Sequence, residues 1–519
     1  MLSTKLRGDW SFDGYVTGDC RAVGDGSYKN VSDGTSSDTV RVTMDAGTDI
    51  DCGSTMNQAN VARALLDGNI SAKLMDTRLT NLLKTELRLG FYNEERTLPS
   101  WGRFKPETHV DTPAHRQLAL EAAEQGLVLL KHKGVLPLDA TKISSVAVIG
   151  PLADATKQLQ GNYYGDAPYL ISPLEGISNY SSGRFSVSFE RGCEADSNET
   201  SASNFSVAAA TASKADATVL VIGADQLRGG AEGNDRGGKY FPADPKSKAD
   251  RSIGLPAPQN ALVVAIARAV AGKPLVVVVI SGESLDLAAV DANANVSAVI
   301  WQGYPSQSGG TALARALFGD TVPSGRLPIT FYKENYAALV PLQDMGMRPN
   351  PATGNPGRTY RFYPGPEVVY PCFTGLSYTT FSHTQHAASL LTVRKAEVVA
   401  ARRAARHEEH SLLSQSITVK NTGRFSAATS VLCFLSPPGA GTGGLPIKKL
   451  IDFARTKILG VGQSEEVRCN VTASDLSEPS PRPAEPDNVE GQLASAELEA
   501  LAGRWLLRFG DVERAVVVD

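Results

Sequence analysis

The sequence lacks a long apolar run, and it contains few cysteines and few histidines. A transmembrane helix needs about 18 to 20 apolar residues in succession, whereas the run PLVVVVI at 274–280 is far shorter and predicts a buried strand. The six cysteines are too scattered for a disulfide scaffold and show no CxxC or metal-ligand spacing, and the seven histidines form no HxxxH pair. We therefore expect neither membrane insertion nor a metal site.

Motifs for nucleotide binding and for a serine nucleophile are also missing. The chain contains no GxxxxGK[ST] loop, and the segment VIGPLADATKQLQG, which follows a predicted strand, does not match GxGxxG. The GxSxG pattern of a nucleophile elbow is absent. A net charge of −4 gives the protein no general attraction to nucleic acid. A nucleotide-binding α/β protein is therefore the weakest of the functions considered.

Composition and targeting signals are those of an ordinary globular protein. The chain has 519 residues, of which 42% are hydrophobic and 20% charged, enough for several domains with buried cores. The first ten residues lack the apolar segment of a signal peptide. Seven N-x-S/T sequons favour a secretory route only mildly. They lie at Asn30, Asn69, Asn179, Asn198, Asn204, Asn295 and Asn470.

Residues 1–90 alternate between strand-like and helix-like patterns. A short apolar strand is expected at Gly14–Thr17, and the β-branched segment VRVTM at 40–44 also predicts a strand. Residues 59–90 predict two amphipathic helices, because leucines recur at intervals of three and four residues. Residues 91–111 show no periodicity and predict a linker.

Residues 112–335 repeat a pattern of short apolar strands and helices. The run PAHRQLALEAAEQGLVLLKHKG at 113–134 predicts one helix, opened by Thr112 and with Pro113 in its first turn. Short buried strands that alternate with helices predict a mostly parallel sheet covered on both faces, an α/β sandwich. The strands are expected at SSVAVIG, ATVLVIG, PLVVVVISG and SAVIWQG, and helices at PQNALVVAIARAVAG and GGTALARALFG.

The last third of the chain changes to a different pattern. Residues 336–412 are rich in Pro, Gly and Tyr and predict a long connecting segment, with an exposed, charged helical insertion at VRKAEVVAARRAARHEEH. From 413 to 519, short strands separated by turn signals predict a small β-sandwich. These strands are expected at SQSITVKNTG, ATSVLCFLSP, DFARTKILG, EEVRCNVTA and GRWLLRFGD.

Two acidic positions are candidates for catalysis. Asp19 follows the strand at Gly14–Thr17, where barrel enzymes place catalytic side chains, although a carboxylate there could instead cap a turn. Glu232 lies with Asp235 and Arg236 in a glycine-rich loop after ATVLVIG, although such a loop could instead be a solvated surface. Taken alone, each position is more often structural. Together they fit glycoside hydrolysis, which needs a carboxylate and a carboxylic acid flanking one bond.

A series of motifs along nearly the whole chain resembles glycoside hydrolase family 3. They include LRGDWSFDGYVTGDC, AGTDIDCG, AEGNDR, WQGYPSQSGG and GLSYTTF, in the family's order. The segment PNPATGNPGRTYRFY is similar to the β-D-xylosidase branch of plants and fungi, some of whose members also act on α-L-arabinofuranosides. The resemblance implies a (β/α)₈ barrel followed by an α/β sandwich domain and a fibronectin-III-like β-sandwich.

The resemblance also assigns roles to the two acids. Asp19 matches the nucleophile of the family's SDC motif, with Gly18 in place of serine, and Glu232 matches the acid/base of EAEGxDR. A retaining mechanism without a metal or organic cofactor is therefore implied. The pair Asp250–Arg251, which directly precedes SIGLPAPQ, offers an alternative alignment in which no glutamate stands three residues upstream.

The barrel that the resemblance implies would be incomplete here. The family's nucleophile lies late in its barrel, whereas only 18 residues precede Asp19. Residues 1–90 are therefore expected to be a C-terminal barrel remnant with exposed apolar faces. Either Met1 is not the true start of a secreted hydrolase, or the chain is a truncated relative. Cys20 and Cys52 could pair, or their partners could lie in a missing part.

Two functions are consistent with these patterns. The first is an exo-acting, retaining β-D-xylosidase that releases xylose, and in some cases arabinose, from non-reducing ends of xylan-derived oligosaccharides or aryl glycosides. It would work outside the cell or in the cell wall if the full-length form carries a signal peptide. The second is a catalytically inactive relative that binds carbohydrate or a partner. Neither function involves nucleic acid or a membrane.

Overall fold

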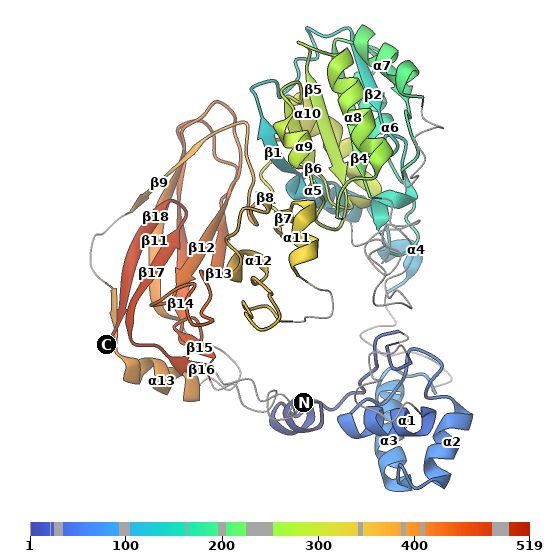
Figure 1. Ribbon diagram of the computed structural model, residues 1–519, viewed down its shortest axis with the longest axis vertical. Coiled ribbons are helices and arrows are strands. Elements are labelled where there is room, and N and C mark those ends of the chain that lie inside the picture. Colours follow the sequence, from blue (N-terminus) through green and yellow to red (C-terminus); the bar gives the residue numbers. More distant parts are fainter. Residues whose placement is uncertain are drawn as a thin grey trace. The chain divides into compact units, whose positions relative to one another are not determined.

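The computed structural model divides the chain into two compact units, which are considered separately (Figure 1). The first lies within residues 1–112, and the second consists of residues 113–482 and 497–519. Among the described residues, none of the helices is both long and apolar enough to span a membrane. The structure describes residues 2–20, 22–24, 35–92, 104–161, 164–195, 204–224, 253–340, 346–385, 391–404, 411–479 and 498–519.

The first unit is mainly helical and has a small core. Four buried side chains form that core, Val40, Met44, Ala64 and Ile70. The two amphipathic helices predicted within 59–90 are confirmed as α2 and α3, and α4 lies inside the segment predicted to be a linker. The helices are η1 (Leu2–Asp9, a π-helix), α1 (Ser36–Ala46), α2 (Gln58–Leu66), α3 (Ala72–Arg88) and α4 (Pro106–His109).

The strand predicted at VRVTM is wrong, because this segment belongs to helix α1. The Thr35 side chain accepts a hydrogen bond from the Asp38 amide and caps the helix, and Gly47 ends it with φ at +118°. Val40 and Met44, four residues apart, face the core on one side of the helix. Caps and helical spacing therefore override the strand preference of the β-branched side chains.

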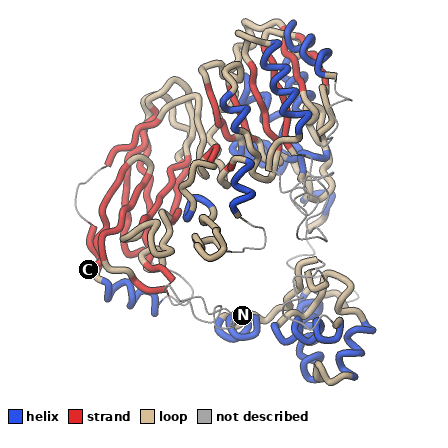
Figure 2. Tube along the Cα trace, in the orientation of Figure 1, coloured by secondary structure: helices blue, strands red, loops and turns tan. Residues whose placement is uncertain are grey.

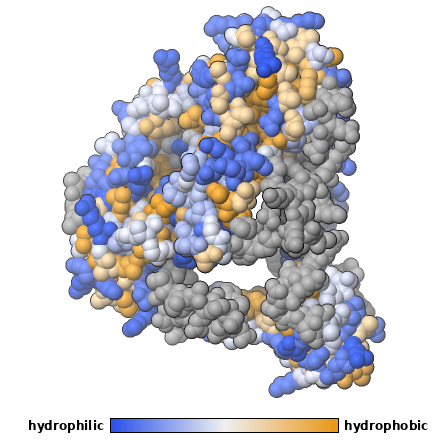
Figure 3. All heavy atoms as spheres, in the orientation of Figure 1, coloured by the Kyte–Doolittle hydropathy of each residue, from blue (hydrophilic) through white to orange (hydrophobic). Residues whose placement is uncertain are grey.

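Apolar side chains also reach the surface of the first unit, as its visible face shows (Figure 3). Leu66 is 85% exposed, and Leu79, Leu83 and Leu87 on α3 are 40%, 42% and 59% exposed. These leucines are spaced four residues apart and form one stripe along the helix. The expectation of exposed apolar faces in this region is therefore confirmed for α3.

The second unit contains the predicted, mostly parallel sheet. Its strand order is β1-β6-β5-β4-β2-β3; β1 is antiparallel to β6, and all other neighbours are parallel. Helices lie on both sides of the sheet (Figure 2). The strands are β1 (Val128–His132), β2 (Ser145–Ile149), β3 (Ser186–Glu190), β4 (Ala217–Gly223), β5 (Leu275–Ile280) and β6 (Ala298–Trp301).

The two faces of the sheet are covered by different helices. One apolar cluster joins the sheet to α5, α6 and α10, and another joins it to α7, α8 and α9. Every residue of β4, β5 and β6 is buried, as expected for strands covered on both sides. The helices are α5 (Pro113–Gly126), α6 (Pro173–Ser181), α7 (Phe205–Lys214), α8 (Ala257–Ala269), α9 (Ala288–Ala292) and α10 (Gly309–Phe318).

The single helix predicted at 113–134 is wrong in its second half. Helix α5 ends at Gly126, and strand β1 begins at Val128. Val128, Leu129 and Leu130 are all buried. Three successive buried side chains suit a strand between two helical layers, because side chains alternate between the faces of a strand. An amphipathic surface helix would turn one of them toward solvent.

A connecting region and two mainly antiparallel sheets, in which only the β10–β18 pair among the described strands is parallel, complete the second unit. The five predicted strands are confirmed as β11, β12, β13, β14 and β17, in sheets ordered β10-β18-β17-β12-β13 and β14-β11-β9. Between β6 and α10 lies η5 (Ser306–Ser308), and the connecting region contains β7 (Phe331–Tyr332), α11 (Glu334–Leu339), α12 (Thr359–Phe362) and β8 (Val368–Tyr370). The later elements are β9 (Phe381–Gln385), β10 (Leu391–Val393), α13 (Lys395–Ala404), β11 (Ser411–Asn421), β12 (Ser430–Ser436), β13 (Lys449–Arg455), β14 (Ser464–Thr472), β15 (Ser477–Pro479), β16 (Leu498–Ala500), β17 (Gly503–Phe509) and β18 (Val512–Val518).

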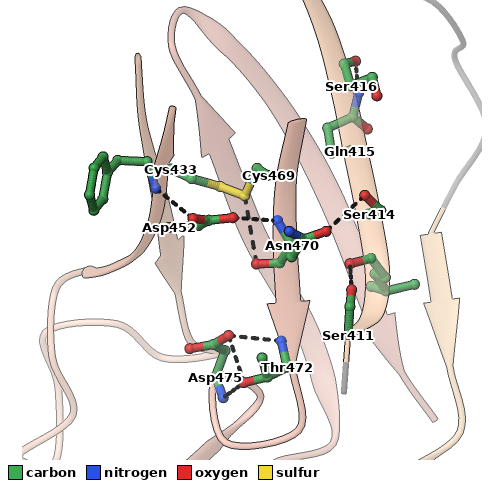
Figure 4. Close-up of a disulfide and its surroundings, with 12 residues drawn as sticks. Ser411, Ser414, Gln415, Ser416, Cys433, Asp452, Cys469, Asn470, Thr472 and Asp475 are labelled. Atoms are coloured by element: carbon green, nitrogen blue, oxygen red, sulfur yellow. Dashed lines mark hydrogen bonds between the residues drawn. A yellow bond between two sulfur atoms is a disulfide. The ribbon is translucent and has the colours of Figure 1, made fainter. Parts of the chain in front are cut away.

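The two mainly antiparallel sheets share one core and are linked by a disulfide. A disulfide joins Cys433 on β12 to Cys469 on β14, and the Asp452 side chain on β13 accepts a 2.8 Å hydrogen bond from the Asn470 amide (Figure 4). Strands β9 and β10 and helix α13 precede residue 413 yet belong to this region. The predicted exposure of that helix is wrong for Val398, which is fully buried in the same core.

Helices α6 and α10 cross at two glycines, and this contact gives a stability prediction. A Cβ added at Gly176 would lie 2.1 Å from the Gly310 carbonyl oxygen, whereas one added at Gly126 would meet nothing within 4 Å. Gly176→Ala should therefore push the helices apart and cost about 1–3 kcal/mol in urea unfolding. Gly126→Ala is the control and should be neutral or stabilise by up to about 1 kcal/mol. Equal stability of the two variants would contradict this packing.

Candidate active site

Asp19 lies in the first unit, directly after a short pairing between two distant segments. The Gly18 amide donates to the Ile50 carbonyl at 2.9 Å, and the Asp49 amide donates to the Val16 carbonyl at 2.8 Å. Thr17 and Ile50 form a parallel bridge. The predicted strand at Gly14–Thr17 is thus reduced, within the described residues, to this one bridge.

A disulfide fixes the chain on the other side of Asp19. Cys20 is bonded to Cys52, with 4.3 Å between their Cα atoms. The sequence left open whether these two cysteines pair with each other or with partners elsewhere, and the structure shows that they pair with each other. The bridge at Thr17 and the disulfide at Cys20 hold the backbone on both sides of the acid.

The Asp19 side chain is chemically available. It is exposed, and among the described residues it has no hydrogen bond or ion pair. A carboxylate with free oxygen lone pairs on an anchored backbone can act as a nucleophile, because no bond to a neighbour has to be broken first.

The second candidate acid, Glu232, lies outside the described residues, as do Asp235, Arg236 and the alternative pair Asp250–Arg251. The described chain stops at Ala224, directly after β4, and resumes at Ile253, before α8. The Ala224 amide donates to the Ile280 carbonyl at 2.9 Å, and the Ile253 carbonyl accepts the Asp286 amide at 2.7 Å. Both flanking residues are thus held against the segment from β5 to α9.

Gln259 anchors the end of β4, a role that was not predicted from the sequence. Its side chain is fully buried and accepts the Gly223 amide at 2.8 Å. It donates to the Gly223 carbonyl at 2.8 Å and to the Ala195 carbonyl at 2.6 Å. The only sequence signal for this role is the position of Gln259 in the motif GLPAPQ.

The two free thiols, Cys193 and Cys372, are buried. Burial raises the pKa of the Cys193 thiol to about 12 and that of Cys372 to about 11. Both therefore stay protonated at neutral pH and are poor nucleophiles. Within the described parts of the chain, no group of three or more His, Cys, Asp or Glu side chains is placed to hold a metal ion.

This arrangement can be compared with known proteins. Residues 127–378 match the glycosyl hydrolase family 3 C-terminal domain, and this part of the chain belongs to glycoside hydrolase family 3. Its resemblance to that family is thereby confirmed. The mixed fold, with a mostly parallel sheet and several antiparallel sheets, fits the C-terminal architecture of the family.

Its relatives include plant and fungal β-xylosidases. Beta-D-xylosidase 1 of Arabidopsis thaliana is 36% identical over 493 residues, which is 91% of this chain and 59% of that protein. Beta-xylosidase/alpha-L-arabinofuranosidase 2 of Medicago sativa subsp. varia is 36% identical over 476 residues, 90% of this chain and 58% of that protein. The chain thus spans less than two thirds of the length of these relatives.

A solved structure supports the same relationship. A family 3 exo-β-xylosidase in complex with a xylobiose aziridine activity-based probe matches the whole chain with a TM-score of 0.83 and 31% identity. This chain covers 63% of that protein.

Removing the side-chain amide of Gln259 should lower the free energy of unfolding of the second unit. Gln259→Met keeps the length of the side chain but leaves the buried Gly223 amide and the Gly223 and Ala195 carbonyls short of partners. Each such group costs about 1–3 kcal/mol, which urea unfolding measures. Gln117→Met, on the exposed face of α5, is the control and should change stability by less than about 0.5 kcal/mol. Equal effects of the two substitutions would show that Gln259 is no anchor.

Proposed function

We propose that the chain is the C-terminal portion of, or a shortened form of, an exo-acting, retaining β-D-xylosidase. It would release xylose from the non-reducing ends of xylan-derived oligosaccharides and also accept α-L-arabinofuranosides. The activities for which its relatives are named support this substrate class. The observation that carries the proposal is Asp19 itself, an exposed carboxylate that has no side-chain partner among the described residues and whose backbone is held on both sides.

The proposed reaction has two steps. Asp19 attacks the anomeric carbon while Glu232 donates a proton to the glycosidic oxygen, so that the leaving alcohol departs and an ester links the sugar to Asp19. Glu232, now a carboxylate, takes a proton from water. The water oxygen attacks the same carbon, and the ester bond breaks to restore Asp19. The two inversions together retain the anomeric configuration, and no cofactor is needed.

The same proposal relates parts of the chain to domains of the family and predicts where the protein is located. Residues 1–90 would correspond to the end of a (β/α)₈ barrel, and residues 413–519 to a fibronectin-III-like domain. The protein would be a secreted glycoprotein. The two disulfides support this location, because such bonds persist mainly in oxidising compartments.

A second function is a non-catalytic protein that binds carbohydrate or a partner. The observation in its favour is the stripe of exposed leucines on α3, since contiguous apolar surface often marks an interaction site. This function predicts binding of xylo-oligosaccharides or of a partner without turnover.

Substitution of the two acids tests the first function on the 519-residue chain. Asp19→Ala should lower kcat on 4-nitrophenyl β-D-xyloside by at least about 10³-fold, because the covalent step loses its nucleophile. Glu232→Ala should lower kcat/KM by about 10²–10⁴-fold on a xyloside with a poor leaving group. The loss should be smaller on the nitrophenyl xyloside, whose leaving group needs less protonation.

Asp250→Ala is the matched control for the acid/base. It should leave both substrates nearly unaffected, whereas a loss at Asp250 and none at Glu232 would establish the alternative alignment. Near-normal turnover by Asp19→Ala would contradict the assignment of the nucleophile. A folded wild-type chain that binds xylo-oligosaccharides without hydrolysing them would favour the second function.

A further inference from the structure

Asp49 is a buried carboxylate that gathers several donors of the first unit. Its side chain is 0% exposed. One oxygen, Oδ2, accepts the Val16 amide at 2.7 Å and also the Arg7 guanidinium. The other, Oδ1, accepts Asn81 Nδ2 at 2.9 Å and Arg78 Nη1 at 3.4 Å. A carboxylate that accepts this many hydrogen bonds in a buried site has little freedom to move.

Arg7 links Asp49 to a second point of the same backbone segment. Besides binding Asp49, its guanidinium donates to the Gly14 carbonyl at 2.7 Å. Arg7 and Asp49 together therefore hold the backbone at Gly14 and Val16. Arg7 and Arg78 are only 15% and 7% exposed, so without the carboxylate two guanidinium groups would lose their counter-charge in a largely dry site.

We propose that Asp49 is the positioning residue for the nucleophile Asp19, an inference that rests on the proposed function. The Asp49 side chain fixes Val16, its own backbone pairs with the same residue, and Asp19 follows three residues later. Asp49 does not touch the sugar in this account. It acts through the backbone, so its loss would displace the attacking oxygen, and a shift of about 1 Å can cost about 10²-fold in rate.

The rival explanation is that Asp49 only stabilises the first unit. The two roles differ in where the structure loosens. A positioning role limits the change to residues 14–20 and to the part of α3 that contacts Asp49 through Arg78 and Asn81. A general structural role loosens helices α1 and α2 as well. Local flexibility therefore separates the two explanations without any need for turnover.

Amide hydrogen exchange of the full chain is the first measurement. Asp49→Asn should raise exchange at the Val16 and Gly18 amides by at least about tenfold and leave α1 and α2, which donate no hydrogen bond to the Asp49 side chain among the described residues, unchanged. Asp45→Asn on α1 is the matched control, because that carboxylate is 53% exposed and paired with Arg41 at the surface. Unchanged exchange at 14–20, or an equal rise throughout the unit, would overturn the proposal. If Asp49→Asn does not fold, Arg7→Gln removes the same contact from the other side and is judged by the same criteria.

Steady-state kinetics on 4-nitrophenyl β-D-xyloside is the second measurement. Asp49→Asn should lower kcat by about 10²-fold and leave KM within about twofold, because a misplaced nucleophile slows the chemical step more than binding. Loosened residues 14–20 with full turnover would show that Asp49 does not position the nucleophile. If Asp49→Asn loosens residues 14–20 but the wild-type chain shows no turnover, the proposed function is rejected and Asp49 is left as a local anchor.

Discussion

Burial of the parallel sheet on both faces is the constraint on which the second unit depends. Because β4, β5 and β6 have no exposed residue, their backbone groups must be satisfied within the protein, and polar side chains can enter only at the strand ends. Gln259 meets this requirement at Gly223, the last residue of β4. The apolar core thus decides where polar anchoring of β4 is needed.

The first unit is organised in a different way. Among its described residues, the core cluster contains four buried apolar side chains, which is little apolar burial for holding a side chain rigidly. Polar and covalent ties take over this task, namely the Asp49 cluster before Asp19 and the Cys20–Cys52 disulfide after it. The proposed nucleophile therefore depends on a few strong local links, and the other unit on a large apolar core.

Helices and strands with a strong local periodicity were predictable from the sequence. Features that depend on residues distant in the chain were not. The run VVVVI identified β5, and the leucine spacing identified α3. The helix at VRVTM was missed because its caps outweigh β-branched preference, and β1 was missed because its burial comes from two helical layers. Asp19 was found through its motif, yet Arg7 and Arg78, which lie 42 and 29 residues from Asp49, leave no local signal. The catalytic roles of Asp19 and Glu232 both stay predictions.

Covalent labelling with a xylose-configured aziridine tests the central claim most directly. Such a reagent reacts with the carboxylate that attacks the anomeric carbon, and peptide mapping by mass spectrometry then locates the ester. The account predicts that the label is found on Asp19 and that an excess of xylose competes with it. A label on another carboxylate, or a folded chain that takes up no label, would contradict the assignment of Asp19 as the nucleophile.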